Sequence, residues 1–204
     1  AGFHHRFNNT FLSAKPFIIM PRFIQSVNHR RFNSSSEYCS VLMDMLINDV
    51  DIVLSVVKSN VKNIYASASA ITQMPSVAPD VINARIEFYN GCAAHFVASR
   101  IAEEDSHKMT FYCRDSYTNI DMLNNKASLI KKNSDVDDPS FFSQPVGDLR
   151  VEPIMVKQNN IYYDEFTSFA KSILYNKSPE VNVDTILKTY DVVKKIKDKI
   201  NLTF

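Results

Sequence analysis

One stretch of the chain places polar side chains where an apolar helix is expected. The segment VLMDMLINDVDIVL, residues 41–54, is mostly apolar, yet it carries three aspartates and one asparagine. At a helical period of 3.6, Asp44, Asn48, Asp51 and Ser55 fall on one narrow stripe. Such a stripe could line a water-filled cleft or a ligand site, or it could form a hydrogen-bonded network inside the protein. The pattern alone leaves both interpretations open.

Histidine is the next candidate for chemistry, but the five histidines match no metal-binding motif in their spacing. His4 and His5 are adjacent, so on an extended chain their side chains point to opposite sides, and one ion is not expected to bind both. The sequence therefore predicts no metal site. The basic run at 29–31 could hold an anionic substrate group through guanidinium forks, or it could be a solvated strand end.

Glycine is rare, because the sequence contains only Gly2, Gly91 and Gly147. A Rossmann-type domain needs a glycine-rich turn, typically G-x-G-x-x-G, so that its backbone can approach the phosphates of a dinucleotide. Neither that motif nor G-x-x-x-x-G-K-[ST] occurs here. This chain is therefore not expected to bind NAD or NADP by itself in the usual way.

Composition and charge narrow the class of protein. The 204 residues are 45% hydrophobic and 22% charged, which is ordinary for a globular domain. A net charge of +1 lacks the basic surface of nucleic-acid-binding proteins, although the aromatic pairs at 88–89 and 111–112 resemble those of RNA-binding sheets. No apolar run approaches the roughly 20 residues of a membrane span, and three scattered cysteines are typical of a reducing compartment. We expect a cytoplasmic protein with no membrane span and no nucleic-acid partner.

Alternating helices and strands must position these residues. A helix capped by Asn8 is expected to run to about Lys15, and the striped helix is expected over about residues 37–58. Asn90-Gly91 predicts a two-residue hairpin turn between two strands. The expected strands are PRFIQSVNHRRF, VKNIYASASAI, VINARIEFY, CAAHFVASRI, KMTFYCRD, YTNIDML, ASLIKK and LRVEPIMVKQ.

The last third of the chain is expected to hold an acidic loop at 133–144 and two amphipathic helices. These helices are YYDEFTSFAKSILYN and TILKTYDVVKKIKDKI, the second of which is expected to be capped by Asp184. The fold class is therefore α+β, with a large, mostly antiparallel or mixed, open-faced sheet and helices packed on one face. We expect one domain over residues 1–204.

Four segments together resemble a known family. GFHHRFN, RFIQS, MDMLINDVDIVLSVV and ARIEFYNGCAAHFVASRI occur in the order typical of the C-terminal domain of the Gfo/Idh/MocA oxidoreductases, in their sugar-dehydrogenase-like branch. The resemblance covers residues 2–202. In this family a Rossmann domain, with a glycine-rich turn and an E-K-P motif, precedes this domain. The resemblance thus implies a fragment, with NAD or NADP bound only in the full-length protein.

The resemblance also assigns a role to the striped helix, which in the family carries D-x-x-x-H facing the substrate. Asp44 matches the aspartate, and Asn48 occupies the position of the histidine. The histidine is expected to transfer a proton while hydride leaves a sugar hydroxyl, whereas asparagine can orient that hydroxyl but cannot titrate near neutral pH. The family's S-H-R is Ser26-Val27-Asn28 here, so neither Val27 nor Asn28 is assigned a substrate contact.

Three other residues complete the candidate site implied by the resemblance. His4 and Arg6 lie at the domain junction, so His4 is expected to contact the cofactor and Arg6 the substrate. Arg100 is either a substrate contact or a structural ion-pair partner. The implied function is the substrate-binding half of an NAD(P)-dependent oxidoreductase acting on a sugar or cyclitol derivative, and the isolated chain is expected to be inactive. The alternative, suggested by Asn48 and by Val27-Asn28, is a non-catalytic ligand-binding or interaction module of the same fold.

The predicted sheet has apolar residues on both faces, as the strand at 81–88 illustrates. Helices account for one face only, and an open apolar face tends to be buried against another copy. The family resemblance likewise implies face-to-face packing of sheets. We therefore expect a homo-oligomer that assembles through the open face.

Overall fold

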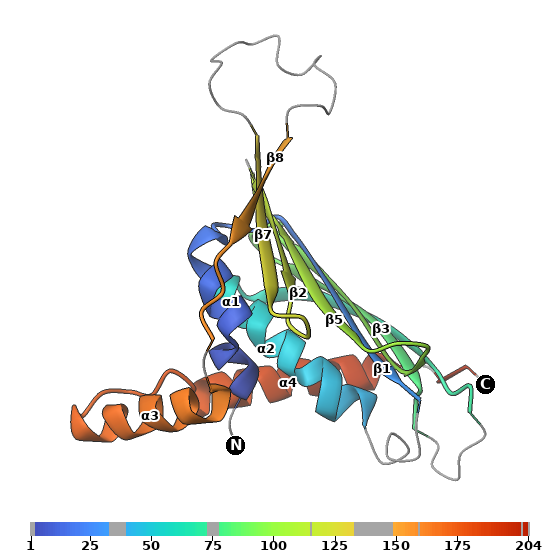
Figure 1. The fold of residues 1–204 in the computed structure, drawn as a ribbon. Coiled ribbons are helices and arrows are strands. Elements are labelled where there is room, and N and C mark those ends of the chain that lie inside the picture. The colour runs from blue at the N-terminus through green and yellow to red at the C-terminus, as the bar shows by residue number, and fades with distance from the viewer. Residues whose placement is uncertain are drawn as a thin grey trace.

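The centre of the molecule is one mixed sheet of nine strands in the order β8-β7-β6-β5-β1-β4-β3-β2-β9 (Figure 1). The computed structural model describes residues 3–32, 40–72, 78–114, 116–132, 149–158, 160–200 and 202–203. The pairs β1–β4 and β2–β9 are parallel, and the other neighbouring strands are antiparallel. The strands are β1 (Phe23–Arg31), β2 (Val61–Ser69), β3 (Val81–Phe88), β4 (Ala93–Ala102), β5 (Ser106–Tyr112), β6 (Ser116–Asp121), β7 (Lys126–Lys132), β8 (Leu149–Ile154) and β9 (Leu202–Thr203).

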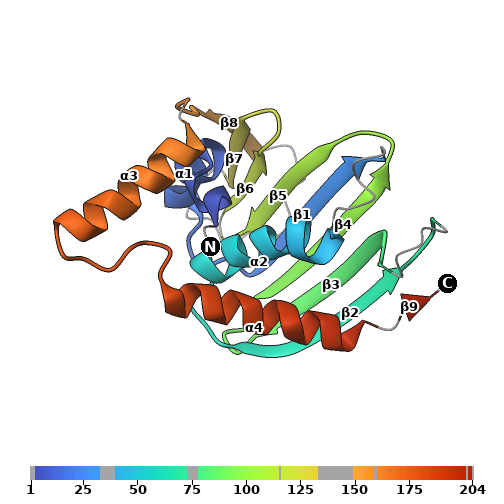
Figure 2. The ribbon, with the colours of Figure 1, turned by 90° about the horizontal axis from the view of Figure 1, so that it is seen from below.

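Helices cover one face of this sheet. Figure 2 shows α1, α2 and α4 on the same face, whereas α3 extends away from it. The predicted α+β class, with a mixed sheet and helices on one face, is confirmed. None of the helices in the described part of the chain is long and apolar enough to cross a membrane. The helices are η1 (His4–Phe7), α1 (Asn9–Ala14), η2 (Lys15–Phe17), η4 (Val41–Leu46), α2 (Ile47–Val56), α3 (Ile161–Leu174) and α4 (Val183–Lys199).

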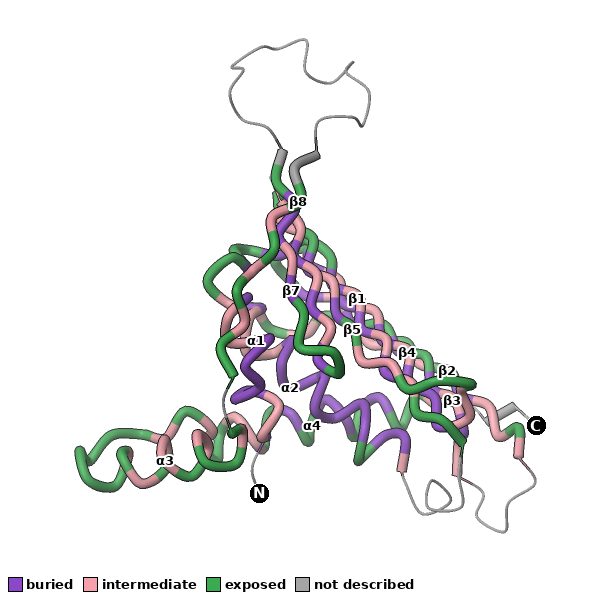
Figure 3. Tube along the Cα trace, in the orientation of Figure 1, coloured by how far each residue is buried: buried purple, intermediate pink, exposed green. Residues whose placement is uncertain are grey.

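The hydrophobic core lies between the sheet and these helices. Along β3, Ile82, Ala84, Ile86 and Phe88 are buried, and the residues between them are exposed or half-buried. Because side chains alternate between the two faces of a strand, every second side chain of β3 points toward the helices. Figure 3 shows a similar alternation along β1, β4 and β5. The core therefore fixes which strand residues face α2 and which face the open side.

The hairpin of β3 and β4 closes with a loop one residue longer than predicted. The backbone N–H of Phe88 donates to the Cys92 carbonyl over 2.9 Å, and that of Gly91 donates to the Phe88 carbonyl over 3.0 Å. Gly91 has φ of +84°, a left-handed conformation that glycine adopts without a Cβ clash. The hairpin is confirmed, but the two-residue turn is wrong, because residues 89–91 form a three-residue loop that ends in a left-handed residue.

Asparagine and serine side chains begin the helices. Asn8 caps α1, since its Oδ1 accepts from the N–H groups of Thr10 and Phe11, as predicted. The last helix differs from expectation, because Asn182 caps α4 and Asp184 lies inside its first turn. The positive end of the helix dipole still stabilises a carboxylate in the first turn. The expected start of the striped helix and the acidic loop at 133–144 both include residues outside the described ranges.

Candidate functional site

The striped helix begins with an unusual turn. Residues 41–46 form η4, a π-helical segment, and α2 continues directly from it. A π-helix bonds each residue to the fifth one along, so residues rotate less per step than in an α-helix. A stripe drawn at 3.6 residues per turn is therefore wrong across this junction. Asp49, which lay off the stripe, faces the sheet and bonds to Ser26 of β1.

Asp44 and Asn48, the predicted catalytic pair, lie one turn apart at the start of this helix. Asp44 is exposed, and its carboxylate accepts from the backbone N–H of Ser40 over 2.6 Å. Asn48 is buried, and its Nδ2 donates to the Asp44 carbonyl over 3.2 Å. Asp44 thus stabilises the helix start together with Ser40, whose Oγ accepts from the N–H of Met43. The pair is thus divided between an exposed and a buried position, and a substrate contact by either residue stays a prediction.

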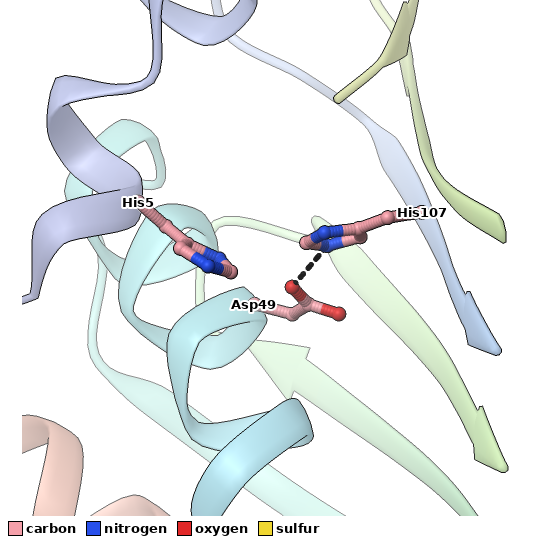
Figure 4. A group of neighbouring side chains, drawn as sticks. All are labelled: His5, Asp49 and His107. Carbon is pink, nitrogen blue, oxygen red and sulfur yellow. Dashed lines mark hydrogen bonds and ion pairs between the residues drawn. The ribbon is translucent and has the colours of Figure 1, made fainter. Parts of the chain in front are cut away.

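Three side chains from distant parts of the chain meet beneath α2. His5 of η1, Asp49 of α2 and His107 of β5 approach one another (Figure 4). Together with Ser26 and Asn28 of β1, they form what we term the Asp49 cluster. His107 Nε2 lies 2.7 Å from Asp49 Oδ1. The other oxygen, Oδ2, accepts from Ser26 Oγ over 2.8 Å and from Asn28 Nδ2 over 3.4 Å.

Strand register explains this convergence. Antiparallel pairing places Asn28 of β1 opposite His107 of β5, on the face that α2 covers. Ser26 lies two residues before Asn28 and therefore on the same face. From the other side, η1 brings the His5 ring to 5.3 Å from that of His107, between ring centroids. The sheet therefore sets the position of the polar groups, and η1 closes the cluster.

The charges in the Asp49 cluster follow from its burial. Burial lowers the pKa of His5 to about 4, and the neighbouring His107 adds to this effect. For His107, burial alone would lower the pKa, but the charge and hydrogen bond of Asp49 outweigh it and raise the pKa. Burial alone would raise the pKa of Asp49, but His107 and Ser26 hold it below the usual value. These directions favour the ionised form of Asp49, the protonated form of His107 and the neutral form of His5.

A second buried aspartate of α2 is held differently. Arg6 binds Asp51 with both ends of the guanidinium fork, Nε to Oδ2 over 2.5 Å and Nη2 to Oδ1 over 2.8 Å. Thr189 of α4 donates from Oγ1 to Oδ1 over 3.1 Å. We term these three residues the Asp51 cluster. It joins η1, α2 and α4, and it engages the guanidinium of Arg6, the predicted substrate contact.

Arg100 and His4, the remaining predicted site residues, lie apart from each other. Arg100 is 1% exposed, and its Nε donates to Asp80 Oδ1 over 2.8 Å. This geometry is that of the ion pair, one of the two roles expected for Arg100, and a substrate contact stays a prediction. His4 lies on η1, where its ring packs against His5 and, at 5.5 Å between centroids, against Tyr162 of α3. A cofactor contact by His4 also stays a prediction.

Sequence reasoning missed His5, Asp49 and His107 as a group. The prediction of no metal site rested on spacing along the chain, whereas these residues meet only through the fold. One signal was present in the sequence. His107 lies two and four residues before Met109 and Phe111, which are buried on the helix-covered face. The alternation of the strand therefore predicts that the titratable ring of His107 lies on the same apolar face.

Comparisons with known proteins point to one family. Residues 18–117 match the family model of the GFO/IDH/MocA C-terminal domain. A search of curated proteins found no sequence match. Solved structures nevertheless share the fold, among them UDP-N-acetylglucosamine 3-dehydrogenase GnnA from Acidithiobacillus ferrooxidans, with a TM-score of 0.87 at 18% identity. The alignment covers 98% of this chain and 61% of that one.

Two further structures show the same partial coverage. Levoglucosan dehydrogenase in complex with NADH has a TM-score of 0.79 at 14% identity, over 97% of this chain and 62% of that one. An oxidoreductase domain protein from Kribbella flavida has a TM-score of 0.77 at 11% identity, over 97% of this chain and 62% of that one. This chain thus spans about 60% of the length of the solved structures that it matches.

Proposed function

Since this chain carries the C-terminal domain of the GFO/IDH/MocA oxidoreductases, we propose that it is the substrate-binding and oligomerisation half of an NAD(P)-dependent enzyme acting on a sugar or cyclitol derivative. One observation carries the proposal. Nearly the whole chain, 98% of it, superposes on 61% of the chain of a UDP-N-acetylglucosamine 3-dehydrogenase. The complex of levoglucosan dehydrogenase with NADH supports the same assignment of cofactor.

In this proposal the start of the striped helix faces the substrate. Asp44 orients the reacting hydroxyl, and Asn48 contacts it by hydrogen bonding. The bond from Asn48 Nδ2 to the Asp44 carbonyl fixes the orientation of the amide, which suits a positioning role. His4 contacts the cofactor from η1. Arg6 binds Asp51 and Arg100 binds Asp80, so an anionic substrate group at either guanidinium would share it with a carboxylate.

Oxidation of a sugar by the full-length protein tests the proposal. We expect the full-length protein to reduce NAD⁺ or NADP⁺ with at least one of three substrate classes: free sugars, nucleotide sugars or cyclitols. The absorbance of the reduced cofactor measures this reaction. Asp44→Asn should lower kcat/KM at least about tenfold while keeping an oxygen that can accept from Ser40 N–H. His95→Asn is the matched control, because His95 lies on the opposite face of the sheet, beside Asn83. No reduction with any class would contradict the enzymatic function.

A non-catalytic module is the second candidate, and Asn48 is the observation that favours it. Asparagine supplies no acid-base group at a position where the family places a histidine. A module of this kind would bind a sugar without turning it over. Thermal stabilisation by a sugar that the full-length protein does not oxidise, with either NAD⁺ or NADP⁺ present, would support this candidate.

The cofactor proposal has a corollary for the 204-residue chain. Because it lacks a glycine-rich phosphate-binding turn, we propose that the chain alone binds neither NADH nor NADPH. Titration calorimetry should therefore detect no binding. Dissociation constants in the micromolar range would contradict this corollary without bearing on the function of the full-length protein.

We further propose that the open face of the sheet assembles copies of this chain. Phe23, Tyr112 and Tyr117 form an aromatic row there, with ring centroids 5.8 and 5.5 Å apart between successive residues. Phe23 and Tyr112 are 36% and 37% exposed, so part of this aromatic row is accessible to a second copy of the chain. Analytical ultracentrifugation should show a homo-oligomer that Tyr112→Arg weakens. A 23.3 kDa species alone at tens of micromolar would contradict the proposal.

A further inference from the structure

We propose that His5, Asp49 and His107 form a binding site for one divalent transition-metal ion of the zinc class. Each of the three side chains offers one donor atom, and these atoms all lie within 4.8 Å of one another. Metal–ligand distances of about 2.0–2.2 Å require donor atoms roughly 3–3.5 Å apart. Side-chain rotations that move the donor atoms by about 1 Å would therefore complete the site. Figure 4 shows the three side chains directed toward a common point.

The donor set selects the class of ion. Imidazole nitrogens suit zinc, copper, iron and nickel, whereas magnesium and calcium prefer oxygen ligands. Two imidazoles and one carboxylate therefore favour a transition metal over Mg²⁺. Three protein ligands also leave at least one coordination position for water.

The carboxylate of Asp49 is oriented in advance. Its Oδ2 accepts from Ser26 and Asn28, which leaves Oδ1 directed at His107. Hydrogen bonds of this kind to a ligating carboxylate fix its direction and contribute to metal affinity. A bound metal ion would replace the hydrogen bond between Oδ1 and His107 Nε2, and the ring would ligate it in the neutral form.

His5 supplies the independent observation that points to a ligand. Its Nδ1 is enclosed, and among the described residues it has no hydrogen-bond partner. Buried polar atoms are usually paired, so such an atom needs an explanation. A simple ion pair of Asp49 with His107 does not account for this enclosed nitrogen, because it does not involve His5.

Isothermal titration calorimetry tests this proposal without substrate or nicotinamide cofactor. ZnCl₂ is titrated into the full-length protein after treatment with a chelator. We expect one ion per chain with a dissociation constant in the micromolar range or below. His5→Asn and His107→Asn should each weaken binding by about 100-fold or more, and Ser26→Ala by about 10–100-fold through the orientation of Asp49. MgCl₂ should bind far more weakly.

His95→Asn is the control variant, since His95 lies on the open face of the sheet and should leave zinc affinity unchanged. Far-ultraviolet circular dichroism of each variant verifies that it is folded. His5→Asn is the least disruptive ligand change, because His5 is only half-buried on the short helix η1. Absence of zinc binding to the parent protein, or zinc binding that folded His5→Asn retains in full, would overturn the proposal. Neither result bears on sugar oxidation, which is measured separately.

Discussion

The Asp49 and Asp51 clusters show how two nearby aspartates of one helix acquire different properties. Both carboxylates are buried on α2, and adjacent residues of η1 approach them, His5 toward Asp49 and Arg6 onto Asp51. Asp51 is bound by a guanidinium fork and a hydroxyl. Asp49 is bound by an imidazole, a hydroxyl and an amide.

The difference lies in whether the partner can change its state. Arginine stays charged at any accessible pH, and its fork matches a carboxylate, so the Asp51 cluster is a fixed structural joint. Imidazoles gain or lose a proton near neutral pH and ligate metals. The Asp49 cluster therefore retains the capacity for chemistry, whereas the Asp51 cluster holds η1, α2 and α4 together.

The largest expected effect comes from breaking the Asp51 cluster. Arg6→Met leaves a carboxylate buried without its charged partner, so it should lower the free energy of unfolding by about 3–5 kcal/mol. The double variant Arg6→Met with Asp51→Leu should regain most of this loss, because no buried charge remains. Urea denaturation measures both variants. A loss below about 1 kcal/mol for Arg6→Met would contradict the structural role.

A smaller loss is expected in the Asp49 cluster. His107→Gln keeps an N–H donor near Asp49 Oδ1 but removes the charge, so the free energy of unfolding should fall by about 1–2 kcal/mol. Urea denaturation in the presence of a chelator removes any contribution from bound metal. If His107→Gln cost as much as Arg6→Met, the two clusters would be equally structural and the comparison would fail.

Acid tests a third buried aspartate, Asp80, which pairs with Arg100. Burial alone would raise the pKa of Asp80, but the backbone N–H of Thr72 and the guanidinium of Arg100 hold it below its usual value. The ionised form thus stabilises the fold above about pH 4, and this contribution is lost as the pH falls through the folded-state pKa. Asp80→Asn should flatten the dependence of stability on pH below about pH 5, although it lowers stability at pH 7. If the free energy of unfolding changed equally with pH in the parent protein and in Asp80→Asn, the role of the ion pair would be contradicted.

Local sequence patterns predicted most of the fold. The alternation of buried residues in β3, the Asn90-Gly91 turn signal and the Asn8 cap each depend on residues close in the chain, and each element was confirmed. Errors arose where two neighbouring signals competed. Asn182 rather than Asp184 caps α4, and the turn at Gly91 took an extra residue. Both are shifts of one or two positions at the end of an element.

The site was less predictable because it depends on contacts between distant residues. Asp49 and His107 are 58 positions apart, and only the pairing of β1 with β5 places them together. Periodicity gave no signal for Asp49 either, because Asp49 lies off the polar stripe and yet faces the sheet, where it bonds to Ser26. Asp44 and Asn48 were singled out by their stripe and by the family resemblance, and the structure gives them one exposed and one buried position.

The most direct test of the account is the substitution Asn48→His in the full-length protein. If the start of the striped helix faces the substrate of an oxidoreductase, a histidine at this position should act as an acid-base group and raise turnover on a sugar by roughly 10²–10⁴. It should also introduce a titration that controls the rate between about pH 5 and 8. Unchanged turnover and an unchanged pH profile would contradict the assignment of Asn48 to the reacting hydroxyl.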